Sequence, residues 1–145
     1  VSGQLRNPVE GNTYLPFIPA SKLVTEFKGS FNRLTKQVRN FYIKFEVDNT
    51  FTKRNVFTAY NTETVTTGYT LLNAGIGTDF VNKKDQTIFS LGFSAMNIGD
   101  VAYQNHLSRL KYAEENQATG RMGVFNMGRN FSIKLNIPLT VNLNK

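Results

Sequence analysis

Neither cysteine nor tryptophan occurs in this 145-residue chain. The lack of cysteine excludes a disulfide framework, a thiolate metal site and a cysteine nucleophile. It leaves the compartment open, because a cysteine-free chain suits the cytoplasm, the periplasm and the outer membrane alike. The single histidine cannot by itself build a cluster of metal ligands.

Long apolar runs and blocks of like charge are missing as well. No apolar run reaches the roughly 20 residues that a transmembrane helix requires, so membrane insertion would have to use paired strands. The net charge is +7, but the basic residues are scattered, which is more typical of solvated or pore-lining cations than of a nucleic-acid patch. Residues 1–12 lack the basic and apolar regions of a signal peptide, so we expect a barrel chain with this sequence to be a fragment of a longer one.

Apolar and polar side chains alternate with a period of two in five stretches of the chain. The pattern is clearest where Phe41, Ile43 and Phe45 alternate with Lys44 and Glu46. Successive side chains of a strand point to opposite faces, so each stretch predicts a strand with one apolar and one polar face. The predicted strands are residues 22–31, 40–51, 69–80, 87–97 and 130–139. Soluble strands peak near 5 to 6 residues and a tilted strand needs roughly 9 to 11 to cross a bilayer, so these lengths favour a membrane barrel.

The predicted connections alternate between long and short. The long ones are residues 1–21, 52–67 and 98–127, and the short ones are residues 32–39 and 81–86. Outer-membrane barrels have this alternation, because their outer loops are long and their periplasmic turns are short. We also predict a tight turn at residues 82–85 and one or two helical turns over residues 105–115, capped by Asn105. The fold class expected is therefore an all-β antiparallel meander of about five long strands, the last part of a transmembrane β-barrel.

Five short motifs follow one another along the chain. They are Leu15-Pro-Phe-Ile-Pro19, Tyr69-Thr-Leu-Leu-Asn73, Asn97-Ile-Gly-Asp-Val-Ala-Tyr103, His106-Leu-Ser-Arg-Leu-Lys-Tyr112 and Gly128-Arg-Asn-Phe131. In sequence and in order they resemble the C-terminal part of TonB-dependent outer-membrane receptors, whose last strand typically opens on Gly-Arg-Asn. The resemblance covers nearly the whole chain.

This resemblance implies that the strands are the last five of a barrel of about 22 strands. Residues 1–145 would form a single C-terminal barrel segment without the plug domain, with residues 98–127 extracellular and residues 81–86 periplasmic. Receptors of the family often end on an aromatic residue of the last strand, whereas this chain continues past Leu139. We expect residues 140–145 to be a disordered tail.

The function implied by the resemblance is uptake of a nutrient, such as a siderophore or another metal chelate, through the outer membrane of a Gram-negative bacterium. The chain would supply barrel wall and extracellular loops and would not be competent alone. Its partners would be the remaining barrel strands and plug, outer-membrane lipid and a TonB-type energy-coupling protein. No cofactor and no nucleic acid is implied. The isolated chain, with an apolar face and two open edges, is expected to need detergent, the missing strands or self-association.

Candidate ligand contacts are confined to the longest connection. They are His106, Arg109, Lys111 and Arg121. We expect His106 to be solvated, whereas the three cations could attract an anionic ligand, contact lipopolysaccharide or be solvated. Elsewhere, the carboxylates Glu46 and Asp48 share one strand face and are expected to pair across strands with Lys28, Lys44 or Lys134 rather than to act as acid and base. No catalytic constellation is found, so an enzyme is the least expected class.

A soluble antiparallel β-barrel or sandwich that binds a small ligand or nucleic acid is the alternative, favoured by the positive charge and the lack of tryptophan. The two folds differ in the environment of six side chains, which face lipid in a membrane barrel and form a buried core in a soluble one. They are Phe41, Ile43, Phe45, Ile133, Leu135 and Ile137. Aromatic residues near the strand ends fit either a membrane-interface girdle or ordinary sheet packing. They are Phe31, Phe41, Phe51, Tyr69 and Phe80.

Overall fold

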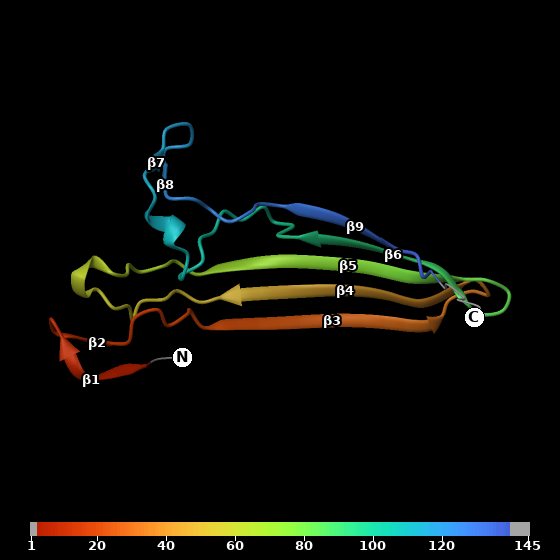
Figure 1. Cartoon of the computed structure of the whole chain (residues 1–145), viewed down its shortest axis with the longest axis horizontal. Helices are drawn as coiled ribbons and strands as arrows, with labels where there is room; N and C mark the ends of the chain where they lie inside the picture. Colours follow the sequence, from red (N-terminus) through yellow and green to blue (C-terminus); the bar gives the residue numbers. More distant parts are fainter. Residues whose placement is uncertain (1–2, 140–145) are drawn as a thin grey trace, which may run out of the picture. The chain divides into compact units, whose positions relative to one another are not determined.

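One antiparallel sheet of five long strands dominates the structure (Figure 1). The computed structural model describes residues 3–139, so the expected tail at residues 140–145 lies outside the described residues. The strands are β3 (Lys22–Arg33), β4 (Val38–Thr50), β5 (Tyr69–Val81), β6 (Thr87–Met96) and β9 (Asn130–Asn136). Their spatial order is β3-β4-β5-β6-β9, and the sheet is open rather than closed into a barrel. The prediction of an all-β antiparallel meander is therefore confirmed.

The chain divides into two compact units, which we describe separately. The sheet unit comprises Thr25–Val47, Leu72–Gly99 and Arg129–Lys145. The loop unit comprises Val1–Val24, Asp48–Leu71 and Asp100–Gly128. The sheet unit holds most of the five strands, and the loop unit holds the three long connections.

The strand register of the sheet unit keeps like side chains on one face. Residues directly opposite each other in neighbouring strands share a face. Ile76 of β5 lies opposite Phe93 of β6, and Phe93 in turn lies opposite Ile133 of β9. The short connection between β5 and β6 is the predicted tight turn, in which the Asn82 side chain accepts hydrogen bonds from the backbone of Lys84 at 2.8 Å and of Gln86 at 3.0 Å.

The apolar face of the sheet is exposed. Ile43 is 55% exposed, Ile133 74% and Leu135 59%, and Phe45 and Ile137 are exposed as well. Phe41 is half-buried against Phe31, with 6.3 Å between the ring centroids. No large side chain among the described residues is fully buried. The sheet therefore has no dry core of its own beneath this face.

The opposite face of the sheet unit is polar and internally bonded. Lys44 Nζ lies 3.2 Å from a carboxylate oxygen of Glu26 and 3.3 Å from one of Glu46. The Asn73 amide donates to Glu46 at 2.8 Å and accepts from the backbone N–H of Asn97 at 2.9 Å. Glu46 pairs with Lys44, but along β4 and not across strands, so the expected cross-strand pairing is wrong for Glu46. Asp48 pairs with Lys22 at 2.7 Å rather than with Lys28, Lys44 or Lys134.

A glycine on this polar face allows close packing. A Cβ atom at Gly77 would lie 2.5 Å from Cε1 of the Tyr42 ring, so that ring rests directly on the glycine backbone. Lys28 Nζ lies 5.1 Å from the centroid of the same ring. The expectation that small residues here accept a closely approaching part of the protein is confirmed at Gly77.

Several local expectations are wrong. Residues 1–21 contain a hairpin, β1 (Gln4–Val9) and β2 (Asn12–Tyr14), because Glu10 and Gly11 both adopt the positive φ of a tight hairpin turn. The last strand ends at Asn136 rather than at residue 139, consistent with Pro138, which has no N–H to donate to a sheet.

Of the one or two helical turns expected over residues 105–115, one 3-10 turn forms, η2 (Arg109–Tyr112), but its N-cap is Ser108 and not Asn105. A second 3-10 turn, η1 (Ala59–Asn61), and a short hairpin of β7 (Glu115–Asn116) and β8 (Arg121–Met122) were not predicted. Among the described residues no helix is long and apolar enough to cross a membrane.

Candidate functional site

A buried polar cluster lies within the loop unit. An isolated β-bridge joins the two ends of the connection between β4 and β5. In this bridge the backbones of Lys53 and Thr66 exchange hydrogen bonds at 3.0 and 3.2 Å. Asn105 shapes the adjoining segment, because its side-chain oxygen accepts the backbone N–H of Leu107 at 2.9 Å. This turn sets the direction in which His106 enters the cluster.

Glu63 is the anionic centre of the cluster. Its side chain is 5% exposed. One carboxylate oxygen accepts the backbone N–H of Phe17 at 2.6 Å, and the other accepts the backbone N–H of Phe57 at 2.9 Å. Hydrogen bonds to a charged acceptor are shorter and stronger than neutral ones, so Glu63 ties together segments that are far apart in sequence.

His106 lies against this carboxylate and is buried, with 1% of its side chain exposed. Its Nδ1 atom lies 2.8 Å from Thr66 Oγ1, and its Nε2 atom lies 3.6 Å from a carboxylate oxygen of Glu63. The expectation of a solvated histidine is therefore wrong. The imidazole is covered because the turn at Asn105 directs it inward.

The groups around His106 favour one tautomer of its imidazole ring. Lys111 Nζ has only protons to offer and donates to Thr66 Oγ1 at 2.8 Å. In the tautomer with the imidazole proton on Nε2, the Thr66 hydroxyl donates to His106 Nδ1. In the other tautomer a lone pair on Nε2 would face the carboxylate of Glu63, which is repulsive.

Burial lowers the pKa of His106 below its ordinary value, because desolvation disfavours the imidazolium. The positive charges of Lys111 and Lys53 lower this pKa further, and the negative charge of Glu63 acts in the opposite direction. The net shift is downward, so His106 is neutral in the folded protein near pH 7.

Lys111 is part of the cluster and is not available as a surface cation. It is buried, and besides Thr66 its ammonium donates to the backbone oxygen of Thr64 at 3.1 Å. The ammonium also lies 4.8 Å from the centroid of the Tyr112 ring. These contacts commit Lys111 to the structure of the loops.

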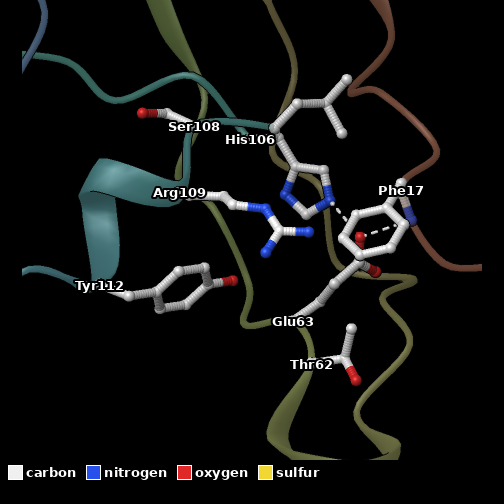
Figure 2. Close-up of a pocket in the computed structure, with 8 residues that line it drawn as sticks. Phe17, Thr62, Glu63, His106, Ser108, Arg109 and Tyr112 are labelled. Atoms are coloured by element: carbon white, nitrogen blue, oxygen red, sulfur yellow. Dashed lines mark hydrogen bonds and ion pairs between the residues drawn. The ribbon is translucent and has the colours of Figure 1, made fainter.

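A hollow of about 370 Å³ opens beside the buried cluster (Figure 2). Glu63 and His106 line it from the cluster side. Arg109 extends from η2 between His106 and Tyr112, with its guanidinium near the ring of Phe17 (Figure 2). The distance from Arg109 Cζ to the centroid of the Phe17 ring is 5.7 Å.

Comparison with protein-family models, with curated proteins and with solved structures found no match. The chemistry of the site therefore has to be judged from its geometry.

The order carboxylate, imidazole and hydroxyl in Glu63, His106 and Thr66 invites comparison with a nucleophilic triad. The geometry does not fit that role. The Thr66 hydroxyl is buried and bonded to Lys111, and the contact of His106 with Glu63 is longer than a hydrogen bond. The contacts among Glu63, His106 and Thr66 are instead suited to holding the loops in place. No group of three or more metal-binding side chains occurs in the described part of the chain.

The structure brings together three of the four candidate residues, namely His106, Arg109 and Lys111. The fourth, Arg121 in β8, is exposed and stacks on another ring, with its Cζ 5.3 Å from the centroid of Phe125. Sequence reasoning missed Glu63 and Phe17. Glu63 lies in a threonine-rich connection with no periodic pattern, so nothing in the sequence indicated that its carboxylate would be buried.

Proposed function

We propose that this chain forms wall and loops of an outer-membrane transport barrel of the TonB-dependent receptor type, located in the outer membrane of a Gram-negative bacterium. The observation that carries the proposal is the exposed apolar face that runs across all five strands of the sheet. Ile43, Ile76, Leu91 and Ile133 represent four of these strands and are all exposed. In a barrel this face contacts lipid.

The polar face supports the same proposal. Outer-membrane barrels are apolar outside and polar inside, with the two kinds of side chain alternating along each strand. The network of Glu26, Lys44, Glu46 and Asn73 lies on the face opposite the apolar one. It satisfies charged groups with one another, as a surface lining a polar lumen requires.

Strand length and edges also agree with a barrel wall. β3, β4, β5 and β6 have 12, 13, 13 and 10 residues, which is enough for a tilted strand to cross a bilayer. β3 and β9 are the outer strands of the described sheet, and each has one edge that the sheet does not pair. In the proposal these edges pair with the remaining strands of the barrel, because backbone groups in lipid must be satisfied.

The soluble alternative requires the same apolar side chains to be buried in a core. Ile43, Phe45, Ile133, Leu135 and Ile137 are exposed instead. The membrane proposal is therefore the better supported of the two. In this proposal the chain is not an enzyme, and nutrient uptake would need the plug and the energy-coupling protein as partners.

Paired single-cysteine variants test the lipid contact directly. The chain has no cysteine, so Ile133→Cys and Lys134→Cys each introduce one unique labelling site, on opposite faces of β9. With the chain reconstituted in liposomes, brominated lipids should quench a fluorophore at residue 133 strongly and one at residue 134 weakly. Equal quenching at both residues would contradict the proposal.

A further inference from the structure

The hollow beside His106 has the dimensions of a site for a small ligand. Its volume of about 370 Å³ lies at the lower end of the roughly 300 to 1,000 Å³ that ligand pockets span. Phe17, Leu107 and Tyr112 give it apolar walls, and Thr62, Glu63, His106 and Arg109 add polar groups. Such mixed lining is typical of ligand pockets, in which a few polar groups orient a mostly apolar molecule.

Arg109 is the cation that this hollow presents. Its Cζ atom lies over the ring of Phe17, and the guanidinium makes no ion pair or hydrogen bond within the described part of the chain. A contact with a ring leaves the guanidinium N–H groups available to a ligand. A planar fork of donors matches the two oxygens of a carboxylate.

The charges around the hollow favour an anion of low charge. Glu63 is the only carboxylate on its lining, and both oxygens of Glu63 already accept backbone N–H groups. Lys111 and Lys53 add positive charge, and they act on His106 at the edge of the hollow. Glu63 repels each negative charge on a ligand, so the repulsion is smaller for a monoanion than for a phosphate dianion.

The wall of the hollow is strained. Phe17 has a φ of 58°, in the left-handed region that bulky residues avoid. Such a conformation is unfavourable and persists only where the surroundings hold it. Here Glu63 holds the Phe17 backbone and Arg109 covers its ring. Strained residues of this kind cluster at ligand sites.

We propose that the hollow binds a small monoanionic carboxylate with a flat apolar body. Arg109 binds the two carboxylate oxygens, and the body contacts the apolar walls of the hollow. This inference stands on the loop unit alone. It does not depend on a membrane location, so the labelling experiment on β9 and the binding experiment below can fail independently.

The single histidine makes binding measurable by NMR. His106 is the only source of imidazole signals in the chain and lines the hollow. With the full chain in detergent micelles, added benzoate should shift these signals in a saturable way, and the uncharged analogue benzamide should not. Arg109→Gln should weaken benzoate binding at least about tenfold, because it removes a charge-assisted bidentate contact.

Arg121→Gln is the matched control. Arg121, in β8, is also an exposed arginine that lies over a phenylalanine ring, but it does not line the hollow. Its loss should change benzoate affinity by less than about twofold, within the range of ordinary surface substitutions. An Arg121→Gln variant as weak as Arg109→Gln would overturn the proposal, because the effect would then be one of general charge.

A second variant guards against loss of the fold. Imidazole signals of ligand-free Arg109→Gln at the wild-type position would show that the loop unit is intact. If the imidazole signals move, the Arg109→Lys variant provides the test. It keeps the positive charge but lacks the planar guanidinium, so it should bind benzoate more weakly than wild type. Undiminished binding in either variant, no saturable shift in wild type, or inorganic phosphate binding as tightly as benzoate would each overturn the proposal.

Discussion

His106 makes the stability of the loop unit depend on pH. Its pKa is lowered in the folded protein, so below the ordinary value of about 6.5 the unfolded chain takes up a proton that the folded chain does not. The contribution of the neutral imidazole to the free energy of unfolding is therefore fully present above about pH 6.5. It decreases as the pH falls toward the lowered pKa of His106. The slope in this window is at most about 1.4 kcal/mol per pH unit.

Amide hydrogen exchange of Phe17 and Phe57, whose N–H groups are held by Glu63, measures this effect. Exchange at these two amides should speed up relative to the sheet amides between about pH 7 and pH 5.5, after correction for intrinsic rates. The variant His106→Gln should lose most of that pH dependence. If wild type and variant respond equally to pH, some other group is responsible.

The buried histidine also shows where sequence reasoning stops at the scale of single residues. A lone histidine in a long polar connection carries no periodic signal, and solvation is the ordinary expectation for it. Its burial depends on Glu63, Thr66 and Lys111, which come from two different connections. Only the folded loops bring those residues together, so neither the cluster nor the hollow beside it could be derived from local pattern.

At the scale of elements, two glycines on one strand face provide a matched test of sheet packing. A Cβ atom at Gly77 would lie 2.5 Å from the Tyr42 ring, whereas one at Gly75 would meet Phe93 O at 3.7 Å, an ordinary contact. Gly77→Ala should destabilise the sheet by about 1 kcal/mol or more, because Tyr42 must move off the strand and away from Lys28. Gly75→Ala should be neutral or slightly stabilising.

Urea unfolding of the two glycine variants in the same detergent would measure this difference. The informative quantity is the change in midpoint at constant slope. A Gly75→Ala variant that is destabilised as much as Gly77→Ala would show that the close approach of Tyr42 is not what requires glycine at residue 77.

The long strands were predictable because their cause is local. Alternation of apolar and polar side chains places β3, β4, β5, β6 and β9 within a few residues of their observed bounds. The hairpin of β1 and β2 was missed, because Pro8, Pro16 and Pro19 made residues 1–21 resemble a loop. The strand ends depend on backbone hydrogen bonds that the alternation does not encode.

At the scale of the whole molecule, the exposed apolar face determines how the chain behaves in water. Sedimentation should show large assemblies in plain buffer and a small, defined particle in detergent, because the apolar face and the open edges of β3 and β9 associate unless they are covered. A compact monomer in plain buffer would contradict the proposed barrel wall and would favour the soluble alternative.

The exposed face of the sheet also governs which substitutions the chain tolerates. A packed core selects side chains by shape, whereas liquid hydrocarbon accepts any apolar side chain that reaches it. In lipid, Ile133 and Leu135 should therefore exchange freely with valine, leucine or phenylalanine, although a lysine near the bilayer midplane costs roughly 2–4 kcal/mol. Positions on this face would then accept many different apolar residues, whereas position 77 would accept little besides glycine. In a soluble sheet the apolar face would be the more restricted of the two.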